Sequence, residues 1–502
     1  MKAIMLQGTG SDVGKSVICT ALCRYFYQQG YRVAPFKSQN MALNSYVTQD
    51  GKEIGRAQGV QAEAAGIEAL VDMNPILLKP KGEMVSEVVV HGRHFADMEA
   101  GTYRAQVLEK MLQPVQESLD RLAQSFELLV IEGAGSPAEI NLKDRDIANM
   151  RVAKLAKAPV ILVADIERGG VFASIIGTLA LLDPDEKKRV KGFIINKFRG
   201  RKELLDSGIT WLEQETGLPV LGVLPYMEMK VDPEDSMALE SLQFKSKHEQ
   251  RNRNGLDIAI IRFPRISNFT DFLPLWNQPD VYIRYIKSRQ ELKQPDVIIL
   301  PGTKNTIEDL HWLRETGLAD EILRLHQQGS QVVGICGGYQ MLGEKLIDED
   351  QIESNERVIE PGLNLLQLKT WFVPQKKTIR VSGEILAEFG QKTKVEGYEI
   401  HLGRTQRIDE RPFVCLDDGR LDGAISIDER VWGTYLHGIF DNDHFTSHWL
   451  NQLRRQKGIP EQGVLLGSTQ KLERDKVYDD LADWIKQYIN LQQLKEIIGL
   501  TP

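Results

Sequence analysis

The sequence predicts an α/β protein with two doubly wound domains, each built on a mainly parallel sheet. Short apolar runs of strand length alternate with longer segments of helical period, a pattern typical of parallel α/β folds. The runs are hydrophobic throughout, as expected of strands that helices cover on both faces. At 502 residues the chain is also too long for a single hydrophobic core. We therefore expect two such domains in succession.

Changes in composition mark the expected boundaries. Residues 231–254 are predicted to be a linker, because the stretch begins with charged residues and its last ten, 245–254, contain almost nothing to bury. It separates a first domain at 1–230 from a second at 255–445, and residues 446–502 are predicted to form a mostly helical extension. The expected strands include residues 3–7, 33–36, 128–132, 160–164, 192–196, 220–224, 256–261 and 297–300.

Charge and hydropathy indicate which kinds of partner, among nucleic acids, membranes and small molecules, the protein is expected to have. Hydrophobic residues at 42% and charged residues at 26% are ordinary for a globular protein. A formal net charge of −8 disfavours a nucleic-acid partner, and no apolar run is long enough to cross a bilayer. The four cysteines show no metal or disulfide spacing, and the start leaves no room for a signal peptide. We expect a cytoplasmic protein that acts on small molecules, and a homo-oligomer is left open.

A glycine-rich loop, GTGSDVGKS at residues 8–16, follows the first expected strand and precedes a helical pattern. Glycines let backbone N–H groups turn toward phosphate oxygens, Lys15 supplies a positive charge and Ser16 can hold Mg²⁺. A strand–helix turn with a chance Gly-Lys-Ser is the alternative, but the position after the first strand favours nucleotide binding. The predicted phosphate-binding residues are Gly8, Gly10, Gly14, Lys15 and Ser16.

A bound nucleotide needs a carboxylate near its metal ion. Glu132 stands at the carboxyl end of an apolar strand, where open α/β sheets bind their ligands. A turn or helix-capping role is the alternative for Glu132, and we favour the metal role. Asp50 and Glu53 lie in a polar stretch, and for them the metal role and a plain surface role are equally supported. The predicted Mg²⁺ ligands are Ser16, Glu132 and Asp50.

A second chemical site is expected at Cys336. The sequence VVGICGGYQML at 332–342 is predicted to be strand, tight turn and helix, with Gly334 and Gly338 flanking the thiol at the spacing of a nucleophile elbow. A helix that begins just behind a thiol favours the reactive thiolate. The backbone N–H groups of Gly337 and of the turn containing Gly302 are candidates for an oxyanion hole. Cys19, Cys23 and Cys415 are instead interpreted as structural cysteines.

His437 is the predicted base for Cys336, because it follows an apolar strand at its carboxyl end. His401 is the second candidate. Glutamine amidotransferases of the triad class carry a glutamate two residues after this histidine, where the present chain has Ile439. The residues therefore predict a Cys–His dyad, without a named group to orient the imidazole.

The phosphate loop and the EGAG segment at 132–135 resemble the dethiobiotin-synthetase-like group of P-loop enzymes, which activate a carboxylate by phosphorylation. Asn196 resembles the segment that reads the nucleotide base in that group. This resemblance implies ATP, with Mg²⁺, as a substrate of the first domain.

Over nearly the full length, the chain resembles the cobyric acid synthase family of glutamine amidotransferases. The resemblance rests on FKSQNMALNS at 36–45, EIGRAQ at 53–58, EGAGSPAEINL at 132–142, PGTKNT at 301–306 and the segments around Cys336 and His437. It implies a class I-type amidotransferase domain that takes ammonia from glutamine and lacks the triad glutamate. It also implies amidation of adenosylcobyrinic acid a,c-diamide at its b, d, e and g carboxylates. Residues in the loops that would then face the corrinoid are Lys37, Asn40, Asn44, Asp146 and Asn149.

Two other functions are weighed against this one. A cobyrinic acid a,c-diamide synthase would perform the same chemistry earlier in the pathway. The sequence FKSQNMALNS at 36–45 argues against it, because this segment resembles the later enzyme. A P-loop switch or partitioning ATPase with an inactive appended amidotransferase domain would hydrolyse ATP and release no glutamate. For each predicted corrinoid contact, a loop that caps a neighbouring helix is the plainer alternative.

Overall fold

The computed structural model describes residues 1–81, 85–99, 108–227, 255–354, 356–390, 392–464 and 467–500. The linker predicted at 231–254 lies outside these residues. The described chain forms two compact units. The first combines residues from Met1–Ala42, Glu53–Asp232 and Leu472–Pro502, and the second combines residues from Leu43–Lys52 and Pro233–Lys471. Two stretches thus pack away from their sequence neighbours: the ten residues Leu43–Lys52 and the C-terminal helices.

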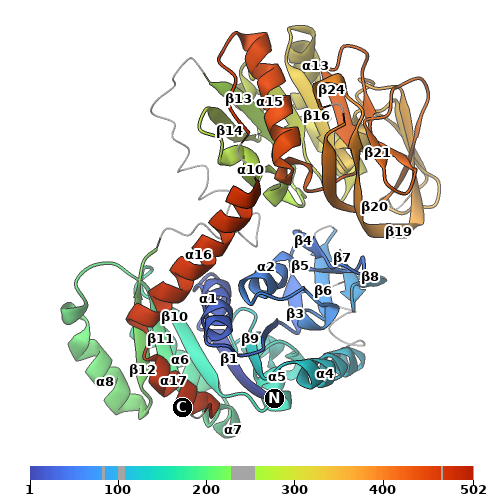
Figure 1. The fold of residues 1–502 in the computed structure, drawn as a ribbon. Helices are drawn as coiled ribbons and strands as arrows, with labels where there is room; N and C mark the ends of the chain where they lie inside the picture. Colours follow the sequence, from blue (N-terminus) through green and yellow to red (C-terminus); the bar gives the residue numbers. More distant parts are fainter. Residues whose placement is uncertain are drawn as a thin grey trace. The chain divides into compact units, whose positions relative to one another are not determined.

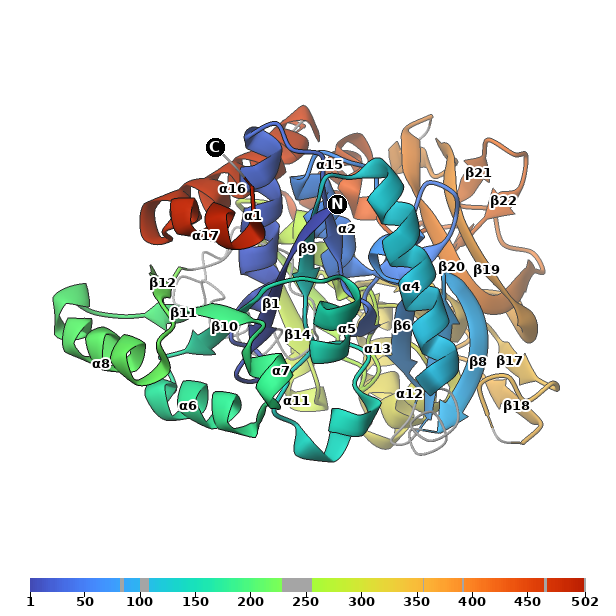
Figure 2. The same cartoon turned by 90° about the horizontal axis from the view of Figure 1, so that it is seen from below.

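The first unit is built on a parallel sheet with the strand order β12-β11-β10-β1-β9-β2. Its strands are β1 (Lys2–Gly8), β2 (Val33–Phe36), β9 (Leu128–Glu132), β10 (Val160–Asp165), β11 (Val190–Phe198) and β12 (Val220–Pro225). Figure 2 shows α1 and α17 on one face of this sheet and α6 and α7 on the other. Burial on both faces explains the continuous hydrophobicity of the strands. The predicted doubly wound fold is confirmed.

Helices of the first unit are α1 (Lys15–Gln28), α2 (Arg56–Ala64), α4 (Leu108–Ser125), α5 (Met150–Leu155), α6 (Val171–Leu181), α7 (Pro184–Lys187), α8 (Asp206–Thr216), α16 (Gly467–Tyr488) and α17 (Leu491–Ile498). A smaller sheet in the order β3-β6-β7-β8 lies in the same unit (Figure 1). Its strands are β3 (Gln39–Met41), β6 (Ile76–Pro80), β7 (Val85–Val90) and β8 (Arg93–Glu99), and β5 (Glu53–Gly55) precedes α2.

The C-terminal helices complete the core of the first unit. Leu481 and Ile485 of α16 and Leu494 of α17 are buried in one hydrophobic cluster with Cys23 and Phe26 of α1. Side-chain hydrogen bonds between α1 and α16 reinforce the contact at its edge. The predicted structural role of the α1 cysteines agrees with their complete burial, which raises the pKa of both thiols above the usual range.

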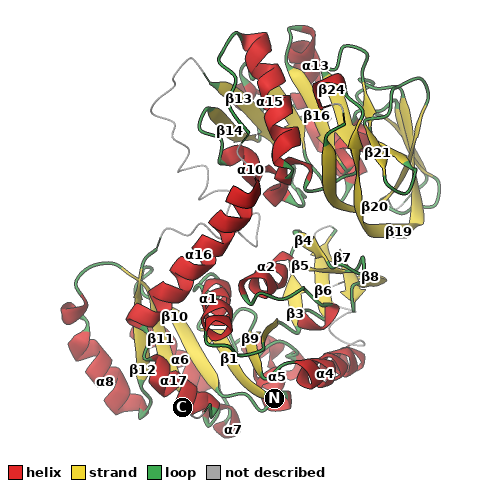
Figure 3. Ribbon diagram, viewed as in Figure 1, coloured by secondary structure: helices red, strands yellow, loops and turns green. Residues whose placement is uncertain are grey.

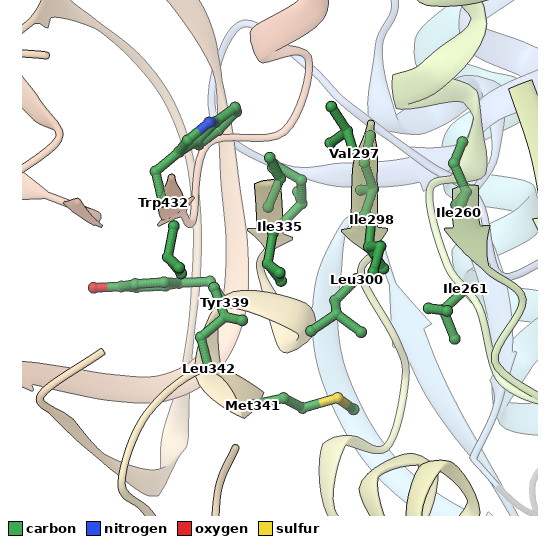
Figure 4. Close-up of a cluster of buried hydrophobic side chains, with 14 of the residues drawn as sticks. Ile260, Ile261, Val297, Ile298, Leu300, Ile335, Tyr339, Met341, Leu342 and Trp432 are labelled. Carbon is green, nitrogen blue, oxygen red and sulfur yellow. The ribbon is translucent and has the colours of Figure 1, made fainter. Parts of the chain in front are cut away.

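The second unit has its own mainly parallel sheet, in the order β14-β13-β15-β16-β24-β23, with only β23 antiparallel. Figure 4 shows apolar side chains from β13, β15, β16 and β24 in one buried cluster that also contains Tyr339 and Leu342, which follow β16. The strands are β13 (Leu256–Ile261), β14 (Val281–Ile286), β15 (Val297–Leu300), β16 (Gln331–Ile335), β23 (Ala424–Ile425) and β24 (Val431–Thr434). Its helices are α10 (Leu273–Trp276), α11 (Arg289–Leu292), α12 (Thr306–Glu315), α13 (Leu318–Gln327), α14 (Gly337–Met341) and α15 (Asp443–Lys457).

A mixed sheet completes the second unit, in the order β18-β17-β19-β21-β22 with β20 paired to β19. Two long antiparallel strands dominate it, β19 (Leu368–Ile385) and β20 (Lys394–Arg407), drawn in yellow in Figure 3. The shorter strands of this sheet are β17 (Lys345–Asp348), β18 (Val358–Pro361), β21 (Val414–Leu416) and β22 (Leu421–Asp422). The short strand β4 (Ser45–Val47) belongs to the same unit but not to this sheet. In the described part of the chain, the structure has no helix with the length and hydropathy of a membrane span.

Because Ile485 packs in the core beside α1, Ile485→Ala should destabilise the first unit by about 2–5 kcal/mol, the usual cost of truncating a buried Ile to Ala. Urea unfolding followed by a probe in the first unit measures this cost. Gln487→Ala, an exposed change on the same helix, is the control and should leave the unfolding midpoint unchanged. Equal midpoints for the two variants would contradict the packing of α16 on this core.

Candidate functional site

The phosphate loop closes around the side chain of Lys15. The Lys15 ammonium group donates to the carbonyl oxygens of Gly10 and Gly135, each at 3.0 Å. Gly14 caps α1 with a φ of 96°, a left-handed conformation that favours glycine, and a Cβ there would collide with the Asn196 amide. Asn196 in turn donates to the carbonyl oxygen of Val13 at 2.9 Å. The structure thus brings the predicted loop residues and Asn196 together.

Glu132 is the buried acceptor at the centre of this site. At 1% exposure its carboxylate accepts hydrogen bonds from Ser16 Oγ at 2.9 Å, Lys37 Nζ at 2.8 Å and Gln61 Nε2 at 2.7 Å. Burial opposes its ionisation, but the charge of Lys37 and these three donors hold the pKa of Glu132 below its usual range. The site therefore keeps an ionised carboxylate beside the hydroxyl of Ser16. Such hard oxygen ligands fit Mg²⁺ that also binds phosphate and water oxygens.

The other carboxylates predicted near the metal have different partners. Asp50 belongs to the second unit, where it is exposed, accepts from Thr48 Oγ1 at 2.5 Å and pairs with Lys52 at 2.7 Å. Glu53 is buried in the first unit and pairs with Lys79 at 2.5 Å. A metal role for Asp50 stays a prediction.

A cavity of about 410 Å³ adjoins the phosphate loop within the first unit. Ser11 and Gly135 line its phosphate side, Gln39 and Met41 come from β3, and Met98 comes from β8. The remaining lining residues are Leu78, Ser86, Val88, Ala134, Ser136, Pro137, Glu139, Leu142, Lys143, Asp146, Ile147, Ala148 and Asn149. One side of the cavity is apolar, and polar groups lie near the phosphate site. Binding sites for organic ligands commonly combine an apolar lining with a few polar groups.

The predicted corrinoid residues divide among several places. Asp146 and Asn149 line the cavity, where Asp146 accepts from the Asn149 N–H at 2.7 Å and Asn149 donates to the Ala134 carbonyl at 2.7 Å. Both side chains thus also hold the loop in shape. Lys37 pairs with Glu132, and Asn40 donates to Gln58 at 3.2 Å. Asn44 is buried in the second unit. Corrinoid contacts by all five stay predictions.

Cys336 sits on a sharp turn between β16 and α14. Its φ of 52° and ψ of −108° are strained for a residue with a Cβ, as is found at nucleophile elbows. The two flanking glycines permit this turn. A Cβ on Gly334 would lie 2.7 Å from the Gly338 carbonyl carbon, and a Cβ on Gly338 would collide with the Leu300 carbonyl. The predicted elbow is therefore present in the structure.

His437 follows β24, and its imidazole lies close enough to the Cys336 sulfur for the two groups to interact. Its Nδ1 lies 2.7 Å from Asp271 Oδ2, and Asp271 Oδ1 accepts from the Gly438 N–H at 3.2 Å. The imidazole also stacks on the Tyr398 ring, with the ring centres 5.1 Å apart. Cys336, His437 and Asp271 thus have the arrangement that a nucleophile, a base and an orienting carboxylate require.

Asp271 keeps the imidazole charged. Burial lowers the pKa of His437, but the nearby Asp271 carboxylate and Cys336 sulfur outweigh burial and raise it to about 10. A protonated imidazole next to a thiol favours the thiolate, which is the attacking form. It also supplies the proton that a leaving amine needs.

Sequence reasoning missed Asp271, which gives the predicted Cys–His pair a carboxylate partner on the imidazole. Asp271 lies 166 residues before His437, on a one-turn helix at Phe269–Phe272. Its only local signal is a carboxylate in a short segment whose other residues, Phe269, Thr270 and Phe272, are buried as well. His401, the second candidate base, has other partners: its Nδ1 contacts the Gly403 carbonyl at 2.7 Å and its ring stacks on Tyr435.

The predicted oxyanion residues lie at the same place. A Cβ on Gly302 would be 3.0 Å from His437 Cε1, so the turn that contains Gly302 touches the imidazole. Gly337 is the first residue of α14, and a Cβ there would be 3.2 Å from the Thr303 nitrogen. The first N–H groups of a helix have no partner within the helix. The binding of an oxyanion by these two backbone groups stays a prediction.

Two family descriptions match this chain, one for each unit. Residues 4–237 match a CobQ/CobB/MinD/ParA nucleotide-binding domain, and residues 257–445 match a CobB/CobQ-like glutamine amidotransferase domain. A cobyric acid synthase from Geobacillus sp. (strain WCH70) is 51% identical, covering 98% of this chain and 97% of that protein. The chain belongs to the cobyric acid synthase family.

Other members of the cobyric acid synthase family are similarly close. The cobyric acid synthase of Desulforamulus reducens is 50% identical over 99% of this chain and 98% of its own length. That of Streptococcus sanguinis is 49% identical over 99% of both chains. The amidotransferase match contains Cys336, His437 and Asp271, and the nucleotide-binding match contains Lys15 and Glu132. Each family domain therefore carries one of the two sites.

Asp271→Asn should lower the glutaminase kcat by about 100-fold or more, because an amide no longer stabilises the imidazolium or fixes its tautomer. Steady-state glutamate release measures this effect. Amidation with ammonium salts in place of glutamine is the control and should proceed at the wild-type rate. A glutaminase rate within about twofold of wild type would show that Asp271 does not serve His437.

The raised pKa of His437 also predicts how stability depends on pH. A group whose pKa rises on folding stabilises the protein fully below its unfolded value, here 6.5, and this contribution is lost as the pH approaches about 10. Asp271→Asn removes the largest influence that raises the pKa. The unfolding free energy of Cys336→Ala should exceed that of the double variant Cys336→Ala, Asp271→Asn, and this difference should shrink between the two pH values. Urea unfolding across this range measures it, and a constant difference would contradict the raised pKa.

Proposed function

We propose that this chain makes cobyric acid, by amidating the b, d, e and g side-chain carboxylates of adenosylcobyrinic acid a,c-diamide with ammonia from glutamine. The observation that carries the proposal is the Cys336–His437–Asp271 site in a chain that also holds a phosphate loop. Similarity over 98% of the chain to proteins named cobyric acid synthase supports the choice of substrate.

The glutaminase half of the reaction uses the second unit. Cys336 Sγ attacks the side-chain amide carbon of glutamine, and the carbonyl electrons move onto an oxyanion that the Gly302 and Gly337 N–H groups stabilise. His437 gives its proton to the departing nitrogen, and ammonia leaves. Water, deprotonated by His437, then hydrolyses the thioester and releases glutamate. Asp271 binds Nδ1 of the imidazole, so that Nε2 gives the proton to the leaving nitrogen and takes the proton from water.

The synthetase half uses the first unit. A carboxylate of the acceptor attacks the γ-phosphorus of ATP, the bond to the β-phosphate oxygen breaks and ADP leaves. Ammonia then attacks the acyl phosphate carbon, and phosphate leaves as the amide forms. Lys15 stabilises phosphate charge, while Ser16 and Glu132 would hold Mg²⁺, which neutralises more of that charge when bound. Activation is needed because a carboxylate is a poor electrophile at neutral pH.

The cavity beside the phosphate loop fits an acceptor with apolar and carboxylate parts. Met41, Leu78 and Val88 form an apolar wall of the cavity. Ser11 and Gly135 line the end of the cavity that adjoins the phosphate site. A substrate held there would present a carboxylate edge to the γ-phosphate, as a near-attack geometry requires.

The test is to incubate the full chain with ATP, glutamine and the a,c-diamide and to follow the product by mass. Four successive amidations are expected. Cys336→Ala should yield no product with glutamine but the full series with ammonium salts, because only ammonia release needs the thiol.

Other outcomes would contradict the proposal. Amidation of cobyrinic acid at its a and c positions alone would indicate the a,c-diamide synthase. ATP hydrolysis without glutamate release or amidation would indicate the switch ATPase. Full glutamine-dependent activity of Cys336→Ala would remove Cys336 from the mechanism.

A further inference from the structure

The ten-residue segment Leu43–Lys52, hereafter the crossing segment, lies beside the Cys336–His437–Asp271 site. It stands in sequence between β3 and β5 of the first unit, yet it packs as part of the second unit. The mechanism above uses none of its residues.

The crossing segment fixes the orientation of a side chain next to His437. The Ser45 N–H donates to Asn268 Oδ1 at 2.9 Å, so the Nδ2 of this amide points the other way. That Nδ2 lies 3.5 Å from His437 Nε2. Asn268 is buried, has a φ of 52° and immediately precedes the one-turn helix that carries Asp271. One backbone N–H of the crossing segment therefore holds a residue that faces the reactive nitrogen of the imidazole.

A second contact reaches both catalytic side chains through β20. Val47 is buried in a small cluster with Tyr398 and Ile400. Tyr398 stacks on the His437 ring, and its backbone N–H and C=O bond to those of His437. Cys336 Sγ donates to the Ile400 carbonyl oxygen at 3.6 Å. The apolar side chain of Val47 thus supports the strand that positions the base and the nucleophile.

Further contacts hold the crossing segment in this place. Arg380 of β19 donates through Nε to the Val47 carbonyl at 2.9 Å, and its guanidinium lies over the Tyr46 ring. At the turn of the segment, Gly51 has a φ of 73°, and a Cβ there would be 3.2 Å from the Thr378 carbonyl. Glycine permits both this conformation and this close approach.

Both ends of the crossing segment join residues of the first unit that lie at or near its cavity. Gln39 and Met41, which line the cavity, stand in β3 just before Leu43. Glu53 follows Lys52 directly, and its buried ion pair with Lys79 holds the returning chain on β6. A ligand that moves Met41 therefore acts on the same short stretch of backbone that presents Ser45 and Val47.

We propose that the crossing segment is a positioning element of the glutaminase site, which holds Asn268 and Tyr398 against His437 and makes ammonia release depend on the acceptor bound beside Gln39 and Met41. This inference rests on the proposed function, because it needs an acceptor in that cavity. Its chemical purpose is to limit the loss of ammonia when there is no carboxylate to amidate.

The test uses two variants of the full chain that disturb the crossing segment without touching catalytic residues. Arg380→Gln removes the hydrogen bond to the Val47 carbonyl, and Val47→Ala removes the packing on Tyr398 and keeps the backbone contacts. Lys394→Gln is the matched control, since it removes one positive charge from an exposed position on β20. Glutamate release is measured with and without ATP and the a,c-diamide.

In the wild-type chain, ATP and the a,c-diamide should raise the glutaminase kcat. In Arg380→Gln and Val47→Ala this stimulated kcat should fall by about threefold to tenfold, the effect of losing one ordinary contact. The KM for glutamine and the amidation rate with ammonium salts should not change, and Lys394→Gln should behave as wild type. A merely structural defect would lower the ammonium-driven rate as well.

Unchanged stimulation in both variants, or equal loss of ammonium-driven amidation, would overturn the inference. The proposed function fails separately, if the wild-type chain does not amidate the a,c-diamide even with ammonium salts. If the wild-type chain amidates the a,c-diamide but its glutaminase rate is the same with and without this acceptor, only the proposed dependence of ammonia release on the acceptor is overturned.

Discussion

Parallel pairing brings the carboxyl ends of neighbouring strands to one edge of a sheet, and both reaction centres depend on this constraint. In the first unit, Leu6 of β1 pairs with Glu132, so the loop that follows β1 and the carboxylate that ends β9 meet at one edge. In the second unit, Ile335 pairs with Thr434, and the next residues along each strand lead to Cys336 and His437. The register of the strands thus determines the distances at which the chemistry takes place.

Both centres also bury charge, which is stable only where partners are close. Glu132 has a cation and two neutral donors, while His437 has a carboxylate on one ring nitrogen and the thiol nearby. Glu132 and His437 cannot easily turn away from these partners, because either side chain would then be a buried charge without a partner. The same pairing that stabilises the fold therefore keeps the reacting groups aligned before any substrate binds.

Local patterns explain what could be predicted from the sequence. The continuous apolar runs predicted β1, β9 and β16, and the glycines around Cys336 predicted its elbow, because each property belongs to a few consecutive residues. Asp271 could not be predicted this way. Its pairing with His437 depends on how β13 and β24 are ordered in the sheet, which no short motif encodes.

The same reason limits the other predictions. Apolar residues in α16 indicate that the helix packs against something, but nothing in its pattern names α1 as the partner. Lys37 pairs with Glu132 because β2 and β9 are neighbours in the sheet, an order that no short motif encodes, and its contact with a corrinoid stays a prediction. The pattern of residues 43–52 is typical of a plain loop, and only the folded chain brings them to the second unit.

The C-terminal helices have a consequence for how the chain is made. Since α16 and α17 supply core residues to α1, the second unit is in effect an insertion within the first. During synthesis on a ribosome, the second unit has all its strands before the first can close its core. Until α16 and α17 are made, the α1 residues that they bury stay exposed, and apolar surface exposed on a nascent chain favours aggregation.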